Sequence, residues 1–111
     1  IDDVANYLPA RLSGLLYVAL SGPNARRAWA VMLADAHHHR SPNAGWPEAA
    51  LAGALNIRLS GPRIYDGALT AEPWVNGAAP DPTAVDLTRG LRLYRFYGLA
   101  LAAVLLLLAV I

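Results

Sequence analysis

The sequence contains no cysteine and no lysine, and only 15% of its 111 residues are charged. The absence of cysteine excludes disulfides, thiolate metal sites and cysteine nucleophiles. The absence of lysine excludes a Walker-type phosphate lysine, and neither G-x-S-x-G nor H-E-x-x-H occurs in the chain. A typical soluble domain has about 25% charged residues. Together with an apolar fraction of 56%, this shortage of charge argues against a free-standing soluble protein.

The length is enough for one domain, and a net charge of +1 gives no field that would attract nucleic acid. The chain begins with Ile1, and its only methionine is Met32. Asp2 and Asp3 stand where a signal peptide would carry positive charge. We therefore expect a fragment or a processed product of a longer protein.

The C-terminal end is the most apolar part of the chain. Residues 96–111, FYGLALAAVLLLLAVI, contain no charge. As a helix they would extend about 24 Å, slightly less than a hydrocarbon core of about 30 Å. The preceding turns add length, because Arg92 and Arg95 can extend their charged ends to the interface. We predict a transmembrane helix over residues 91–111; a buried core helix is the alternative.

A second apolar run, residues 12–22, is too short to cross a bilayer, which takes about 20 residues. Extending it back to Tyr7 places Arg11 at membrane depth, where a charge is costly and usually functional. We predict a membrane-associated helix over residues 7–22. It is either a re-entrant or short membrane helix, or a helix packed on upstream spans.

The region between these segments, residues 23–90, is polar. Apolar residues recur at helical spacing over residues 25–36, opposite two arginines, which predicts an amphipathic helix. Its expected apolar face consists of Ala25, Trp29, Met32, Leu33 and Ala36. A second helix is expected over residues 46–55, with Pro47 at its first position.

Asp66-Gly67 predicts a type I′ hairpin that pairs Ile64–Tyr65 with Ala68–Leu69. We expect residues 71–82 to form a loop, and Asp81-Pro82 to begin a helix that continues into the C-terminal span.

The expected fold class is mostly α: a polytopic membrane protein fragment with transmembrane helices and a polar helix and turn region containing a small β-hairpin. Residues 1–111 would form part of one membrane-embedded domain. Seven of the nine arginines lie between residues 26 and 92. By the positive-inside rule, residues 23–90 are expected to face the cytoplasm.

The histidine run 37–39 suggests zinc, because imidazole is a good zinc ligand. However, adjacent side chains on a helix point about 100° apart, so three in a row do not close one tetrahedral site. A solvated helix end is the simpler interpretation, since cations are favourable at a helix C-terminus. One histidine acting in a site is still possible.

Residues 41–48, SPNAGWPE, combine a tight turn with a helix N-terminus, where free N–H groups can bind a phosphate or carboxylate. Glu48 in the first turn would oppose an anion; it could instead bind a cation or accept a proton from an amine. Ordinary helix capping is the alternative.

Acidic residues also gather at the start of the chain. In a helix, Asp2, Asp3 and Asn6 share a face, and oxygen ligands of this kind suit Mg²⁺. A solvated helix start is again the alternative. The fork of Arg11 suits a carboxylate or phosphate.

Two long motifs carry a resemblance to a known family. DDVANYLPARL (2–12) and HRSPNAGWPEAALAGAL (39–55) resemble the membrane-bound cobalamin biosynthesis proteins that act as adenosylcobinamide-phosphate synthases (CbiB/CobD type). RLSGPRIYDG (58–67) and RGLRLYR (89–95) also fit that family. The resemblance covers essentially the whole chain and implies the C-terminal third to half of a family member.

The resemblance implies an ATP-dependent amide-forming ligase, with Mg²⁺, that joins adenosylcobyric acid to aminopropanol or its phosphate. It also implies a multi-pass protein of the bacterial inner membrane, whose expected partners are lipid and other cobalamin-biosynthesis membrane proteins. The alternative is a non-catalytic scaffold or anchoring subunit for corrinoid-processing enzymes.

Site roles follow from the same resemblance. The catalytic residues would be Asp3 and, as the base, His39 or Glu48, with Asp2 and Asp3 on Mg²⁺–phosphate. The expected substrate-binding residues are Asn6, Arg11, Ser41, Asn43, Gly45, Trp46, Arg63 and Tyr65. Of these, Arg11 and Arg63 would clamp anions, and Ser41 and Asn43 would hold substrate.

Overall fold

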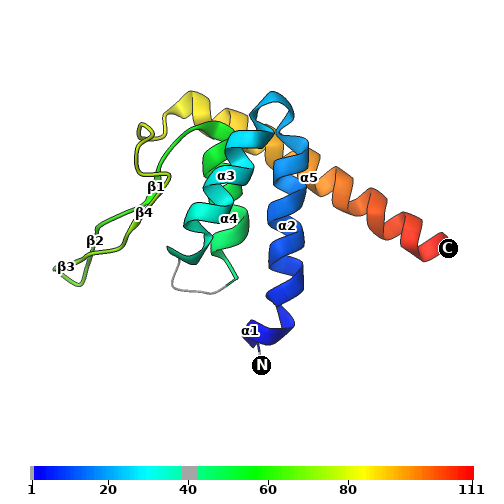
Figure 1. Ribbon diagram of the computed structural model, residues 1–111, viewed down its shortest axis with the longest axis horizontal. Helices are drawn as coiled ribbons and strands as arrows, with labels where there is room; N and C mark the ends of the chain where they lie inside the picture. Colours follow the sequence, from blue (N-terminus) through cyan, green and yellow to red (C-terminus); the bar gives the residue numbers. More distant parts are fainter. Residues whose placement is uncertain (1, 39–42) are drawn as a thin grey trace.

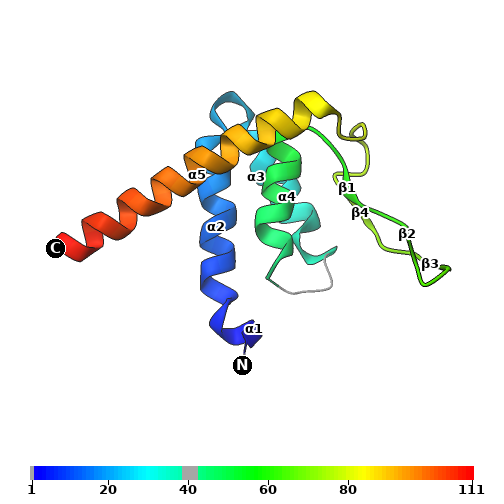
Figure 2. The ribbon, with the colours of Figure 1, turned by 180° about the vertical axis from the view of Figure 1, so that it is seen from behind.

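The computed structural model describes residues 2–38 and 43–111. Its main helices are α2 (Tyr7–Leu20), α3 (Ala25–Asp35), α4 (Gly45–Leu55) and α5 (Ala84–Val110). Short helical turns are α1 (Asp2–Ala5), η1 (Gly22–Asn24) and η2 (Ala36–His38). The strands are β1 (Leu59–Ser60), β2 (Arg63–Tyr65), β3 (Ala68–Thr70) and β4 (Trp74–Val75). Helices α2, α3 and α4 pack together, and α5 crosses α2 and α4 before projecting away from them (Figures 1 and 2).

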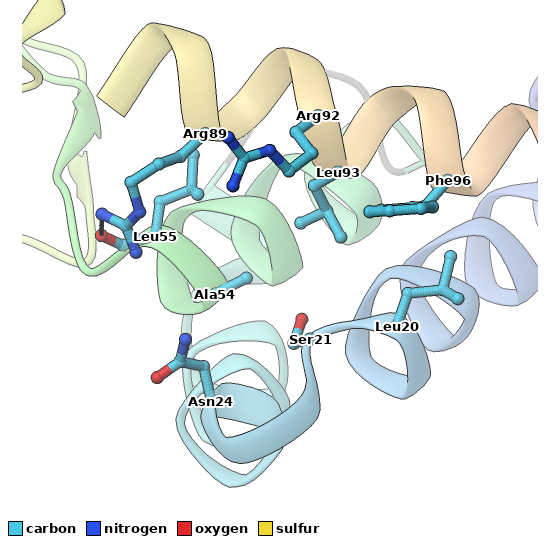
Figure 3. A pocket seen from close by; sticks show the side chains of 9 residues that line it. All are labelled: Leu20, Ser21, Asn24, Ala54, Leu55, Arg89, Arg92, Leu93 and Phe96. Atoms are coloured by element: carbon cyan, nitrogen blue, oxygen red, sulfur yellow. Dashed lines mark hydrogen bonds between the residues drawn. The ribbon is translucent and has the colours of Figure 1, made fainter. Parts of the chain in front are cut away.

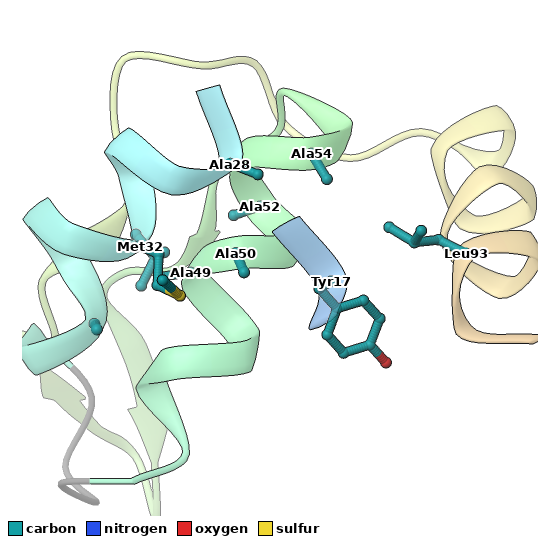
Figure 4. Close-up of a cluster of buried hydrophobic side chains, with 10 residues drawn as sticks. Tyr17, Ala28, Met32, Ala49, Ala50, Ala52, Ala54 and Leu93 are labelled. Carbon is teal, nitrogen blue, oxygen red and sulfur yellow. The ribbon is translucent and has the colours of Figure 1, made fainter. Parts of the chain in front are cut away.

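Helix α4 lies at the centre of the packing because its side chains are small. It contributes four buried alanines to the core, namely Ala49, Ala50, Ala52 and Ala54. Met32 of α3, Tyr17 of α2 and Leu93 of α5 belong to the same cluster (Figure 4). At Gly53 the two backbones approach so closely that an added Cβ would lie 2.7 Å from Ala28 Cα. Only small residues permit this separation between α3 and α4.

The predicted helix over residues 25–36 is confirmed as α3, but its expected apolar face is partly wrong. Met32 and Ala36 are buried, whereas Trp29 and Leu33 are 44% and 52% exposed. Ala28, which the pattern left out, is fully buried. The face is shifted because α4 approaches so closely that an alanine fits the contact and larger side chains point away.

Three side chains from different elements satisfy the carbonyl groups at the end of α4. Arg27 donates to Gly53 O at 2.6 Å and to Ala54 O at 3.2 Å. Arg89 of α5 donates to Leu55 O at 3.3 Å, and the Asn76 amide donates to Ala52 O and Ile57 O at 3.4 and 3.1 Å. The last carbonyls of a helix lack intrahelical partners and attract cations, so these contacts tie the surrounding elements to α4. Arg27 and Arg89 therefore hold α3 and α5 against the end of α4.

The hairpin prediction is confirmed. Strands β2 and β3 are antiparallel, with Ile64 opposite Leu69 and Tyr65 opposite Ala68. Asp66 and Gly67 have φ values of 51° and 79°, and a type I′ turn requires positive φ at both positions.

The expected loop over residues 71–82 is partly wrong, because it contains strand β4. This strand pairs with β1, so that Leu59 lies opposite Val75 and Ser60 opposite Trp74. Two-residue strands carry almost no periodic signal, and their pairing depends on residues about fifteen positions apart.

Helix α5 begins later than predicted. Thr83, not Asp81, is the N-cap: its side chain accepts a hydrogen bond from the Asp86 N–H, while Asp86 accepts one from the Thr83 N–H, which is a capping box. Asp81 instead accepts a 2.6 Å hydrogen bond from Arg58 Nε, which holds the pKa of its carboxyl group below the usual value. The continuous run into the C-terminal segment is confirmed.

Among the described residues, α5 is the one helix long and apolar enough to cross a membrane, by length and composition. Most of its side chains are exposed, and Leu93 is its buried residue. A mostly helical fold with a small hairpin is confirmed, and the multi-pass arrangement stays a prediction.

Replacing Gly53 by alanine should destabilise the fold by about 1–3 kcal/mol, because the new methyl group must push α3 from α4. The matched control is Gly98→Ala on α5, where an added Cβ meets nothing within 4 Å. That change should be neutral, or stabilising by up to about 1 kcal/mol through helix propensity. Thermal unfolding of the complete protein in detergent measures both, and equal melting temperatures would contradict the packing described here.

Candidate functional site

The first part of α2 and the beginning of α4 lie side by side, and they bring together the two motifs that are separated by 26 residues or more in the chain (Figures 1 and 2). The contact is direct, because Arg11 Nη1 of α2 donates to Asn43 Oδ1 at 3.3 Å. Residues 6–13 and the segment that follows residue 42 therefore form one surface.

Arg11 is held between two aromatic rings. Its guanidinium carbon lies 3.4 Å from the ring centroid of Tyr7 and 4.6 Å from that of Trp46. Nη1 also donates to Tyr7 O at 2.9 Å. Each cation–π contact at a partly exposed position contributes about 0.5–1 kcal/mol. The guanidinium group is thus held between the two rings, and both of its hydrogen bonds to the described residues are made by Nη1.

Asn43 connects this cation to the start of α4. It is 5% exposed, and its backbone carbonyl accepts a hydrogen bond from Trp46 N at 3.2 Å. Gly45, the buried first residue of α4, follows directly. The turn therefore orients the Asn43 amide toward α2 and positions the Trp46 ring beside Arg11.

A cavity of about 340 Å³ lies beside this contact. Its lining residues are Asn6, Pro9, Ala10, Ser13, Asn43, Ala44 and Pro47. The α2 residues follow helical spacing, and the rest come from the beginning of α4. The polar groups in this lining are amides and a hydroxyl, without an acidic side chain. Such a lining, next to a fixed arginine, suits a carboxylate or phosphate ester near the lower size limit of ligand pockets, about 300 Å³.

The structure places Glu48 away from this lining. Its Oε1 atom accepts a 2.7 Å hydrogen bond from Ser60 Oγ of β1. The carboxylate therefore faces the strand region, which the local pattern around Glu48 does not predict because Ser60 lies twelve residues further along the chain.

The other predicted residues divide into two groups. His39 and Ser41 lie outside the described residues. Asp2 and Asp3 lie on α1, and Arg63 lies on β2 with Tyr65, but the structure does not describe these four side chains. Of the predicted site, the structure thus brings together Asn6, Arg11, Asn43, Gly45 and Trp46.

Among the side chains that the structure describes, which do not include those of Asp2 and Asp3, no group of three histidine or acidic residues is arranged to hold a metal ion. The described lining, with amides and a nearby guanidinium, fits an anion and does not fit Mg²⁺. The Asp2–Asp3 magnesium site stays a prediction.

The sequence pattern favoured a solvated helix end for His38, but contacts with Trp74 and Asp35 orient its ring. Nδ1 lies 3.1 Å from Trp74 O and 3.5 Å from Asp35 Oδ1, while Asp35 Oδ2 accepts a 2.7 Å hydrogen bond from Asn76 N. Ser13 was also missed as a lining residue. Ser13 follows Asn6 by seven residues, or two helical turns, and this spacing could have predicted that both residues lie on one face of α2.

These features define a helical protein with one helix suited to a membrane and a polar, arginine-flanked cavity. A family model described as "CobD/Cbib protein" matches residues 1–94. The chain therefore belongs to the CobD/CbiB family.

Named relatives agree. The chain is 64% identical to "Cobalamin biosynthesis protein CobD" of Rhodobacter capsulatus over 95 residues, which cover 86% of this chain and 30% of that protein. It is 44% identical to the protein of the same name from Desulfotalea psychrophila over 110 residues, covering 96% and 33%. For the Klebsiella pneumoniae protein of that name, the identity is 46% over 96 residues, covering 84% and 30%. The chain thus spans about a third of the length of these relatives, and no solved structure matches it.

Replacing Arg11 by glutamine should lower the stability of the α2–α4 contact by about 1–2 kcal/mol, because the two ring contacts and the bond to buried Asn43 are lost. Arg26→Gln is the control, because it removes the same charge from an exposed position on α3. Thermal unfolding of both variants measures the difference. A melting temperature for Arg11→Gln equal to that of Arg26→Gln would show that the stack contributes nothing.

Proposed function

We propose that this chain contributes to a membrane-bound adenosylcobinamide-phosphate synthase, which joins adenosylcobyric acid to aminopropanol or its phosphate. The observation that carries the proposal is the meeting of residues 6–13 with the beginning of α4 at a cavity, beside which Arg11 is hydrogen-bonded to Asn43. Family membership supports the same step, because the relatives are named as cobalamin biosynthesis proteins.

The reaction forms an amide bond between a side-chain carboxylate of the corrinoid and the amine. When the amine nitrogen attacks the activated carboxyl carbon, a C–N bond forms, the C–O bond to the leaving group breaks, and the nitrogen loses a proton to a base. ATP would supply the phosphoryl group that turns the carboxylate oxygen into a leaving group. A cation near that oxygen and a base near the nitrogen are therefore needed.

Among the side chains that the structure describes, Arg11 is well placed for the anionic group. Its planar fork matches a carboxylate or phosphate, and the Tyr7 and Trp46 rings hold it in one orientation. The amides of Asn6 and Asn43 and the Ser13 hydroxyl would hold the polar ends of the substrate in the cavity.

Two candidate bases stay in the proposal, Glu48 and His39. Glu48 accepts a hydrogen bond from Ser60, so its role as the base requires substrate to reach the β1 side of α4. Asp3, Asp2, Ser41, Arg63 and Tyr65 keep the catalytic, metal and binding roles that the family resemblance implies. No step is assigned to Mg²⁺, since the described lining does not fit it.

The proposed setting is the bacterial inner membrane, with α5 spanning it and residues 23–90 on the cytoplasmic side. The length and apolar composition of α5 support this placement. In this arrangement α2 is a membrane-associated helix, and the complete protein is multi-pass.

In the complete protein, Arg11→Gln and Asn43→Ala should each lower kcat/KM for amide formation about 10-fold to 100-fold, while Arg26→Gln should leave it unchanged. The loss reflects one charge-assisted contact to the substrate anion, worth about 1.5–3 kcal/mol. Formation of the cobinamide from corrinoid acid, amine and ATP is the assay. Full activity in both cavity variants would remove the cavity from the mechanism, and an inactive wild-type protein would favour the scaffold alternative.

Glu48→Gln separates a base from a structural residue. The amide oxygen of glutamine can still accept the Ser60 hydrogen bond, but it cannot take up a proton at neutral pH. If Glu48 is the base, kcat falls at least about 100-fold, because no group is then placed to take the proton from the amine. Ser60→Ala, which removes only the hydrogen bond, is the matched control. Normal turnover by Glu48→Gln would exclude Glu48 as the base and leave His39.

A further inference from the structure

A second cavity, of about 290 Å³, lies at the other end of the helix bundle, where the end of α2 meets the end of α4 and the first half of α5 (Figure 3). Its polar lining comes from Ser21 and Asn24 on one side and from Arg89 and Arg92 on the other. Leu20, Leu93 and Phe96 form its apolar wall. Ala10, in the lining of the first cavity, and Leu20 are ten residues apart, or about 15 Å along α2.

The two arginines have different roles in this cavity. Arg89 donates to Asp86 Oδ1 at 2.9 Å and to Leu55 O at 3.3 Å, so it mainly neutralises a carboxylate and the negative end of α4. Arg92 is exposed and makes no hydrogen bond or ion pair with the described residues. Its side chain turns along α5 toward Arg89 (Figure 3). With Asp86 balanced by Arg89, Arg92 provides the excess positive charge.

The cavity lies where α5 changes from polar to apolar. Arg89, Arg92 and Arg95 are the last charges of the chain, and the charge-free segment begins at Phe96. The cavity lining also changes from polar to apolar along α5, because Arg89 and Arg92 precede Phe96 by less than two helical turns. If α5 spans the membrane, this level corresponds to the headgroup region, where anionic lipids attract basic side chains.

We propose that this cavity binds the headgroup phosphate of an anionic phospholipid, with Arg92 as the main donor and an acyl chain along Leu20 and Phe96. This rests on the membrane placement of α5 in the proposed function. A soluble phosphate would use the arginines, Ser21 and Asn24, but it would gain nothing from the apolar wall. A phospholipid uses both parts of the lining, which is why we assign the cavity to lipid.

The test compares Arg92→Gln with Arg95→Gln in the complete, delipidated protein. Both changes remove one charge from exposed positions on α5, three residues apart, but only Arg92 lines the cavity. Arg89 is left intact, because its loss would also release the end of α4. Native mass spectrometry measures binding of phosphatidylglycerol and of phosphatidylcholine with the same acyl chains.

The wild type should bind phosphatidylglycerol at least about fivefold more tightly than phosphatidylcholine, and Arg92→Gln should lower this ratio about fivefold. Arg95→Gln should keep it. An equal loss in both variants would overturn the proposal, since it would show only a general charge effect, and so would no loss in either. Displacement of the lipid by glycerol phosphate or inorganic phosphate would instead show that a soluble phosphate is the occupant.

Amide formation, measured on the same samples, separates this proposal from the proposed function. Arg92→Gln should lose the lipid preference while it keeps cobinamide formation. A wild-type protein that forms no amide but shows the expected lipid preference would contradict the enzyme assignment alone. A wild type that forms the amide but binds neither lipid would overturn the lipid site alone.

Discussion

The close contact between α3 and α4 at Gly53 is the constraint on which the other contacts depend. An added Cβ there would meet Ala28 Cα at 2.7 Å and Arg27 O at 2.8 Å, so the two backbones lie against each other. Packing is equally close at Gly14 of α2, where an added Cβ would lie 2.7 Å from Met32 Sδ and 3.1 Å from Trp46 O. Because α4 consists mainly of alanine and glycine, both neighbours reach it, and its first residues come beside Arg11.

Both ends of α4 are bound by polar groups from elsewhere in the chain. At its beginning, Asn43 joins it to Arg11, and at its end the carbonyls accept from Arg27, Asn76 and Arg89. These donors come from α3, from the segment after β4, and from α5. The carbonyl end of α4 thus fixes Arg89 on α5, which leaves Arg92 as the cation available at the second cavity. One short helix therefore determines the position of both cavities.

The sequence predicted those elements whose signals are local. Asp66-Gly67 specifies its hairpin because both residues tolerate positive φ, and the long apolar run specifies α5. The pairing of β1 with β4 and the burial of Ala28 were not predictable, since they depend on segments distant in the chain. The N-cap was misplaced because Asp81 and Thr83 are both good capping residues, and the hydrogen bond from Arg58 to Asp81 decides between them.

The candidate site, too, depends on contacts between distant segments that local sequence patterns do not predict. The residue type of Arg11 suggested anion binding, and that of Asn6 a Mg²⁺ ligand. Only the packing of α2 on α4 shows that Asn6 and Asn43 line one cavity, with Arg11 hydrogen-bonded to Asn43 beside it. Packing also turns Glu48 toward Ser60, which local chemistry did not suggest. Since Tyr7 and Trp46 already hold Arg11, the arginine loses little conformational freedom when an anion binds. The aromatic stack therefore prepares the cation for its substrate as well as stabilising the fold.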